Sequence, residues 1–437
     1  MDEVIRFLNH WWREGSVRED LAKEYRREYF DEVVNLLGDR QIIVIYGLRR
    51  VGKSTLMYQL IQELIEKKVK PMNILYFSFD KKIGEIKEIL DTYTKITEKD
   101  YEREKIFVFL DEIYKLKDWY KELKLLYDAL PNIKFIISGS ASLKIEKEAR
   151  KNLTGRAFYI EVKPLTLKEY TELKYKTEIK NIKIWEDKLK INFPIFLKKP
   201  FPEIIDFEHD RVVNYIRELV LDKILFTDFP KAFKKIDIDL LQTLSEIFLS
   251  NPGMYLNIES LSRDLKKSKN DIIRHIKLLE LGYIIRIVKN YRGSRISASR
   301  KLRRVYPYHP SLIQAVFKDI PEPRLVECFV RSHLDAEFYW RKNGREVDFI
   351  HNDAPIEVKY RDNISEKDLK NLFEYMEKFK IKKGYLVSKN RSDEIHRNNK
   401  AIKILPAWYL ALKKFSEITR TGDRISQLNP EEEAREG

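Results

Sequence analysis

The chain has a single cysteine, few glycines and no long apolar run. Cys328 is the only cysteine among 437 residues, which excludes an internal disulfide and a cysteine-based zinc site. No segment approaches the ~18 apolar residues that a membrane helix needs. Asp2, Glu3 and Arg6 do not fit the basic-then-apolar order of a secretory signal. We therefore expect a cytoplasmic protein with no membrane partner.

The 14 glycines, beside abundant lysine, glutamate and isoleucine, resemble the composition of hyperthermophile proteins. A hydrophobic content of 43% and an aromatic content of 12% indicate a globular chain, and the length favours about three domains. Residues 2–37 are predicted to be helical and to pack on the core that follows them.

Residues 47–55 match the phosphate-loop pattern G-x-x-x-x-G-K-[ST]. The β-branched run 42–46 before them is typical of a buried parallel strand, and apolar residues at helical spacing follow. Lys53 is expected to reach the β/γ oxygens of a nucleotide, and the Ser54 hydroxyl to ligate Mg²⁺. The predicted nucleotide-binding residues are Gly47, Arg50, Val51, Gly52, Lys53, Ser54 and Thr55.

The apolar run 105–110 ends in the acid pair Asp111-Glu112. In a nucleoside-triphosphatase site, the first acid positions Mg²⁺ through water, and the second orients or deprotonates the attacking water. The alternative for such a pair is a helix N-cap. The acid pair follows the phosphate loop with another predicted strand, 73–79, between them, which favours the catalytic interpretation.

Ser140 and Arg156 are two further catalytic candidates. Ser140 follows the predicted strand 134–138, and could hold the attacking water or sense the γ-phosphate; a turn serine is the alternative. Arg156 precedes the predicted strand 157–162. It could neutralise phosphate charge in the same or a neighbouring subunit, or form a surface salt bridge.

The net charge of +15 is concentrated in one segment, because residues 261–304 hold 14 lysines and arginines against three acids, a net +11. Three predicted helices and a β-hairpin surround this charge in the order of a winged helix, whose third helix lies in the DNA major groove. Docking of a protein is the alternative use. The candidate DNA-binding residues are Lys269, Asn270, Arg274 and Lys277 on the third helix, and Arg292 and Arg295 at the wing tip.

The C-terminal part carries three acids and a lysine on a predicted helix and hairpin. Glu327 lies on the helix 324–334, Asp348 on one hairpin arm, and Glu357 and Lys359 on one face of the other. Such a group can hold one or two Mg²⁺ ions, with Asp348 and Glu357 as ligands and the lysine stabilising the attacking hydroxide. A charged hairpin face is the alternative.

The chain resembles the archaeal and bacterial AAA-type ATPases of the additional-strand class, in members that carry a winged helix and a restriction-endonuclease-like domain. The resemblance extends to about residue 415. It implies the strand order 5-1-4-3-2, a helical lid, and the PD-(D/E)xK nuclease pattern for the C-terminal group. The segments that carry it are 49–54, 110–113 with Trp119, 138–140, 153–156 and 163–170.

We therefore predict an α/β protein that uses ATP and Mg²⁺, has DNA as its partner and is compatible with a homo-oligomer. It would bind and hydrolyse ATP, hold DNA, and cut it with a metal-dependent domain. The alternative is a nucleotide-gated DNA- or protein-binding regulator with an inactive nuclease fold. The predicted parts are N-terminal helices and P-loop ATPase core 1–165, helical lid 166–235, winged helix 236–312, PD-(D/E)xK nuclease-like domain 313–418 and acidic tail 419–437.

Overall fold

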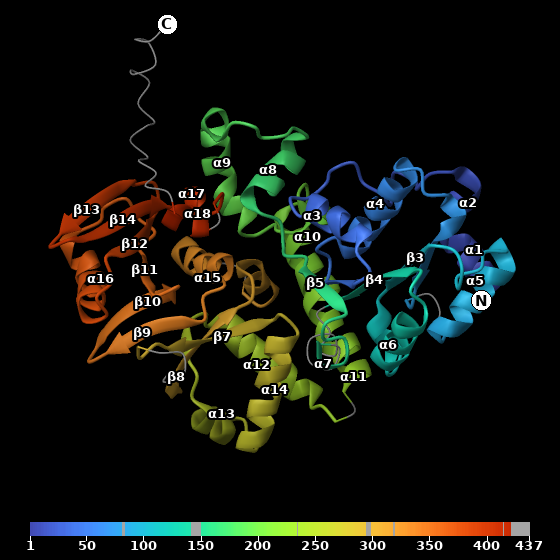
Figure 1. Ribbon diagram of the computed structural model, residues 1–437. Coiled ribbons are helices and arrows are strands. Elements are labelled where there is room, and N and C mark those ends of the chain that lie inside the picture. The colour runs from blue at the N-terminus through green and yellow to red at the C-terminus, as the bar shows by residue number, and fades with distance from the viewer. Residues whose placement is uncertain are drawn as a thin grey trace, which may run out of the picture.

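The computed structural model describes residues 1–80, 84–140, 150–233, 235–293, 299–317, 320–413 and 415–420. A five-stranded sheet lies on one side of the molecule and a nine-stranded sheet on the other, with helices between them (Figure 1). No helix among the described residues has the length and apolar character needed to cross a bilayer.

The first sheet is parallel and has the order β2-β3-β4-β1-β5, which confirms the strand order that the resemblance implied. Every residue of β2 and β3 is buried, as expected for strands covered on both faces. The strands are β1 (Ile42–Gly47), β2 (Ile74–Ser78), β3 (Ile106–Asp111), β4 (Ile133–Ser140) and β5 (Ala157–Glu161). The accompanying helices include α4 (Lys53–Glu66), α5 (Ile86–Thr97) and α6 (Trp119–Ala129).

The N-terminal segment is not the continuous helix predicted for residues 2–37. Gly15, with φ of 75°, ends the second of three short helices, and residues 15–29 have no helix. The expected packing on the core is confirmed, since Trp11 and Phe30 are buried in the same apolar cluster as the first sheet. The helices are α1 (Asp2–Leu8), α2 (Trp11–Glu14) and α3 (Phe30–Asn35), followed by the 3₁₀ turn η1 (Leu36–Gly38).

The same segment covers the open edge of β2. The Asn9 side chain donates to the Tyr76 carbonyl at 2.8 Å and accepts from the Tyr76 amide at 2.7 Å, which copies the hydrogen bonds of a neighbouring strand. The indole N–H groups of Trp11 and Trp12 donate to the Ile74 carbonyl, at 3.3 and 2.8 Å. An edge strand protected in this way cannot pair with another chain.

The helical region predicted as one lid, 166–235, contributes to two different cores. Phe193 and Phe196 pack edge-on against Phe329 of the C-terminal part, with ring centroids 5.5 and 5.8 Å apart. Most buried apolar residues between positions 201 and 229 pack instead in the cluster of the first sheet. The elements are α8 (Leu167–Tyr175), α9 (Ile182–Phe196), η5 (Pro202–Ile204), α10 (His209–Asn214), the π-helical η6 (Tyr215–Leu221) and η7 (Ile224–Asp228), and α11 (Phe229–Ala232).

Three helices and an antiparallel strand pair follow in the order that the sequence predicts. Asn257 and Ser268 accept hydrogen bonds from the amides of Ser260 and Asp271, and so cap the second and third helices. The elements are α12 (Ile238–Ser250), β6 (Met254–Tyr255), α13 (Ile258–Asp264), α14 (Lys269–Leu281), β7 (Ile285–Asn290) and β8 (Ser299–Pro307), then the 3₁₀ segment η8 (Pro310–Ala315).

The nine-stranded sheet joins this region to the C-terminal part, in the order β13-β14-β12-β11-β10-β9-β7-β8-β6. β7 runs parallel to β9, with Asn290 opposite Tyr339, and the Asn290 side chain exchanges two hydrogen bonds with the Arg341 backbone. The boundary predicted near residue 312 is thus bridged by one sheet. The other elements are α15 (Glu322–Leu334), β9 (Phe338–Lys342), β10 (Arg345–His351), β11 (Ala354–Val358), α16 (Glu366–Lys378), β12 (Lys383–Ser388), β13 (Asp393–Arg397), β14 (Lys400–Pro406), α17 (Ala407–Leu410) and α18 (Phe415–Arg420).

Candidate functional site

The phosphate loop begins at a position that only glycine can occupy. Gly47 has φ of 148°, and a Cβ added there would lie 2.2 Å from the Val162 carbonyl oxygen. Gly52, with φ of 97°, precedes the first turn of α4. Arg50 between them also has a left-handed φ of 67°, an uncommon conformation for a residue with a side chain. The loop therefore turns sharply from the end of β1 into the N-terminus of α4.

Lys53 lies inside this loop, and its side chain is buried. The ammonium donates to the carbonyl oxygens of Gly47 at 3.3 Å and Leu48 at 3.0 Å. Burial lowers the pKa of Lys53, while the nearby Glu112 and Asp111 carboxylates act in the opposite direction. The cation is thus positioned between the loop and the predicted acid pair.

Asp111 is the acceptor for three hydroxyl groups from three different elements. Ser54 at the start of α4 donates to Oδ2 at 2.7 Å, and Tyr76 in β2 donates to the same oxygen at 2.8 Å. Ser138 in β4 donates to Oδ1. The structure therefore brings together Lys53, Ser54 and Asp111, three residues that the sequence predicted for one site.

Glu112 follows in a left-handed conformation, with φ of 55°. Its Oε2 is buried and has no hydrogen-bond partner within the described part of the chain. Burial raises the pKa of this carboxyl group, against the opposing charge of Lys53. A buried acceptor without a partner beside a phosphate loop fits a site that takes a water molecule or ligand.

Ser138 was missed by the sequence interpretation, which selected Ser140. β4 continues through Ser140, and the side chain of Ser140 lies outside the description. Ile137 in β4 pairs with Leu110 in β3. This register places the next residue of β4, Ser138, beside the next residue of β3, Asp111. The Ser138 hydroxyl also accepts from the Glu112 amide at 3.3 Å. The sequence signal that could have identified Ser138 is its position as a polar residue at the end of a mainly apolar strand.

Arg156 does not join this site within one chain. Its carbonyl accepts from the Ile42 amide, so it lies at the end of β1 opposite the phosphate loop. Its guanidinium forms an exposed pair with Asp128, at 2.8 and 3.1 Å. The surface salt bridge, which was the alternative interpretation, is the arrangement observed.

Two arginines of the phosphate loop contact the helical region instead. Arg49 forms a two-pronged pair with Asp228 at the end of η7, at 2.7 and 2.9 Å. Arg50, predicted as a nucleotide-binding residue, pairs with Glu203 at 3.0 Å. No local sequence pattern indicates these partners, which lie more than 150 positions away. They connect the phosphate loop directly to residues 203–228.

The predicted DNA-binding side chains of α14 share one exposed face. Lys269, Asn270, Arg274 and Lys277 are exposed, while Ile272, Ile276 and Leu279 are buried on the other side. Lys269 pairs with Glu259 at 2.9 Å and Arg274 with Asp271 at 3.3 Å, so part of the charge is balanced locally. Arg292 is exposed after β7, and Arg295 lies outside the described residues.

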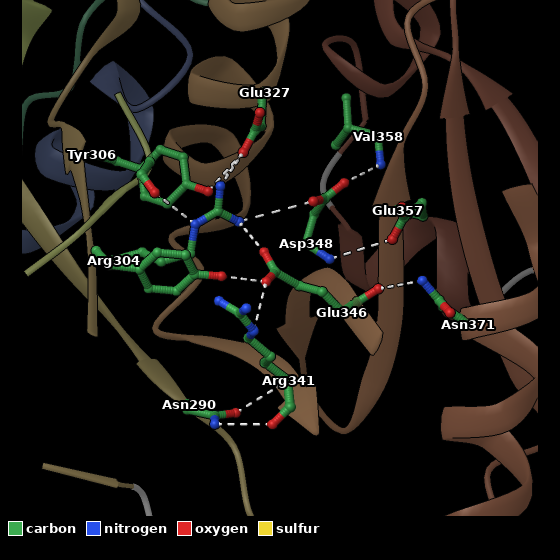
Figure 2. Close-up of polar contacts among 12 residues, drawn as sticks. Asn290, Arg304, Tyr306, Glu327, Arg341, Glu346, Asp348, Glu357, Val358 and Asn371 are labelled. Atoms are coloured by element: carbon green, nitrogen blue, oxygen red, sulfur yellow. Dashed lines mark hydrogen bonds and ion pairs between the residues drawn. The ribbon is translucent and has the colours of Figure 1, made fainter. Parts of the chain in front are cut away.

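Glu327, Asp348 and Glu357 also come together in the C-terminal part (Figure 2), and Lys359 lies beside Glu357. Asp348 accepts from the Val358 amide at 2.9 Å, and Lys359 lies 2.5 Å from Glu357. Burial, followed by the charge of Asp348, raises the pKa of both Glu327 and Glu357.

Arg304 of β8 enters the same group, which the sequence did not predict. Its guanidinium lies 3.1 Å from Glu327, 2.9 Å from Glu346 and 3.9 Å from Asp348 (Figure 2). In the part of the chain that the structure describes, no three Asp, Glu, His or Cys side chains are arranged to hold a metal ion. Asp348 and Glu357, the residues of the expected Mg²⁺ site, are adjacent, since the Asp348 amide donates to the Glu357 carboxylate at 3.4 Å, and Lys359 and Arg304 lie beside them.

Comparisons with known proteins divide the chain into three matched segments. Residues 39–171 match the family described as an AAA domain, residues 200–322 a domain of unknown function (DUF8612), and residues 325–410 a second domain of unknown function (DUF4143). The AAA segment contains the phosphate loop and the acid pair. The chain therefore carries an AAA-type P-loop ATPase domain, followed by the two other domains.

The chain is 28% identical to the uncharacterized protein MJ1637 of Methanocaldococcus jannaschii, with 84% of each chain covered. It is 24% identical to the uncharacterized protein MJ1544 of the same organism, over 80% of this chain and 81% of that one. A structure of C. elegans PCH-2 aligns at 17% identity over 40% of this chain and 44% of that chain, with a TM-score of 0.22.

The contact between the phosphate loop and η7 is tested by a double-mutant cycle on Arg49→Met and Asp228→Asn. Because these side chains are only 22% and 13% exposed, removing either one leaves its partner partly buried and unpaired. We expect a coupling energy of about 1 to 3 kcal/mol in chemical unfolding. The exposed Arg156–Asp128 pair is the matched control, and equal coupling in both cycles would contradict a specific role for Arg49.

Proposed function

We propose that the protein binds and hydrolyses ATP at the site formed by the phosphate loop and the acid pair. The observation that carries the proposal is the shared hydrogen bonding of Asp111 with Ser54, beside the buried Lys53. The match of residues 39–171 to an AAA domain supports it independently. A hydroxyl and a carboxylate in contact are oxygen donors of the type that Mg²⁺ prefers.

Each residue has a definite role in this proposal. Lys53 binds the β- and γ-phosphate oxygens, and Ser54 and Asp111 hold Mg²⁺, which supplies positive charge to the phosphates when bound. Glu112 orients the attacking water and accepts its proton, because burial raises its pKa and makes it a better base. Ser138 fixes the orientation of Asp111. The products are ADP and phosphate.

We expect Lys53→Ala to lower the ATP turnover number by about 100-fold or more, since the cation that binds the transferred phosphate is lost. Glu112→Gln should lose turnover to a similar degree but keep ATP binding, because it removes the base and not the phosphate contacts. Lys70→Ala, at an exposed lysine outside the site, is the control. Unchanged steady-state turnover in Lys53→Ala would defeat the assignment.

We also propose that the protein holds duplex DNA on the exposed face of α14. The support is physical: a capped helix presents Lys269, Arg274 and Lys277 on one side, within a segment of net charge +11. This order of helices and strands is that of a winged helix. The alternative to DNA binding is the docking of a protein on the same face. Glu259 and Asp271 favour this alternative, because they reduce the positive charge of the face.

Arg274→Gln combined with Lys277→Gln should weaken duplex binding and reduce the slope of log affinity against log salt by up to about 2, since each phosphate contact contributes about 0.9. Lys70→Gln with Lys95→Gln makes the same change of charge at exposed positions of the ATPase domain, and should leave binding unaltered. Fluorescence anisotropy at several salt concentrations measures both. Equal slopes in the two double variants would favour protein docking instead.

A second candidate function is metal-dependent DNA cutting by the C-terminal part. It is favoured by the proximity of Glu327, Asp348, Glu357 and Lys359, which have the residue types and order of the PD-(D/E)xK pattern. Arg304 among these acids favours the other alternative, a nucleotide-gated regulator in which the nuclease fold is inactive.

A further inference from the structure

The Arg304 guanidinium is held on several sides, although it comes from a different segment than its acidic partners. Nε donates to the Gly253 carbonyl at 2.8 Å, Nη1 to Glu346 at 2.9 Å and Nη2 to Glu327 at 3.1 Å. Only 12% of the side chain is exposed. Arg304 belongs to β8, whereas Glu327 lies on α15 and Glu346 on β10. The arginine therefore joins two parts of the chain at one point.

Three tyrosine rings enclose the same guanidinium. Its central carbon lies 5.1 Å from the ring centroid of Tyr306, 5.8 Å from that of Tyr339 and 6.0 Å from that of Tyr255, within cation–π range. Tyr306 also donates its hydroxyl hydrogen to Glu327 (Figure 2). Tyr255 donates its hydroxyl hydrogen to Glu346. The rings thus contact the cation and also hold the carboxylates that pair with it.

The backbone leaves space for this arginine. Gly253 has φ of 78°, and a Cβ there would lie 2.7 Å from Arg304 Nη2 and 3.2 Å from the Tyr306 hydroxyl. Burial by itself would lower the pKa of Arg304, but Tyr306, Glu327 and the neighbouring acids raise it above its usual value. The guanidinium is charged at every physiological pH, so its position is occupied by a permanent cation.

The acids of the group already have basic side chains beside them. The basic partners next to them include Arg304, Lys359 at 2.5 Å from Glu357, and Arg341 at 3.8 Å from Glu346. A divalent ion among these groups would have to displace the guanidinium or lie against it. Both alternatives are unfavourable in a buried site, where like charges repel strongly. The four acids are Glu327, Glu346, Asp348 and Glu357.

We propose that Arg304 is the built-in cation of this acid group, held by Glu327 and Glu346 beside the expected metal ligand Asp348, so that the C-terminal part does not bind a catalytic divalent ion. The group acts instead as an ionic joint that connects β8 to α15 and β10. β8 also leads to Tyr308, whose hydroxyl donates to Glu161 at the end of β5 in the ATPase domain. The same strand therefore contacts all three parts of the chain.

The proposal is tested by Mn²⁺ binding to the full-length protein without nucleotide, followed by electron paramagnetic resonance. Wild type and Asp348→Asn should bind the same amount of Mn²⁺, because the acid group takes none in either. Arg304→Gln should gain one Mn²⁺ per chain, with an affinity at least tenfold above any binding in wild type. Adding Asp348→Asn to Arg304→Gln should abolish the gain, and Arg304→Lys, which keeps the positive charge, should show none.

Two results overturn the proposal. The first is a Mn²⁺ ion in wild type that is lost in Asp348→Asn, since a metal would then bind despite the arginine. The second is an Arg304→Gln protein with unchanged circular dichroism and thermal midpoint that gains no Mn²⁺. If Arg304→Gln does not fold, the comparison of wild type with Asp348→Asn decides alone. Equal Mn²⁺ binding by wild type and Asp348→Asn supports the proposal, and weaker binding by Asp348→Asn rejects it. Failure of ATP hydrolysis would leave these outcomes unaffected.

Discussion

The constraint on which the site depends is that β1, β3 and β4 are parallel neighbours and end at the same edge of one sheet. Because they do, the phosphate loop after β1, the acid pair after β3 and Ser138 in β4 meet at Asp111. Hydrogen bonds from Ser54, Tyr76 and Ser138 then fix the carboxylate before any ligand arrives. Such preorganisation reduces the rearrangement needed when phosphate charge must be stabilised.

A second feature is that the three matched domains are joined by more than their linkers. Arg49 connects the phosphate loop to η7, and Phe193 packs residues of the predicted lid against the C-terminal core. β7 and β9 form one sheet across the boundary between the other two domains. A movement of the phosphate loop or of η7 therefore has direct physical routes toward α14 and β8, which coupling between the nucleotide site and the proposed DNA-binding face would require.

Features with a local sequence pattern were predictable. The phosphate loop, the acid pair and the caps of α13 and α14 are specified by neighbouring residues, and the strand order followed from the resemblance. Ser138 and Ser140 could not be separated, because only the register of β4 against β3 decides which one contacts Asp111. The same limit applies to Arg304. Nothing near it in the sequence indicates that its partners Glu327 and Glu346 lie 23 and 42 residues away.

The central claim is that this chain contains one competent triphosphate site, formed where β1 meets α4. Isothermal titration of the purified full-length protein with ATP in the presence of Mg²⁺ tests it most directly. We expect one bound nucleotide per chain, with a dissociation constant on the order of micromolar, as is usual for enzyme substrates. The absence of measurable binding of either ATP or ADP at millimolar concentration would contradict it.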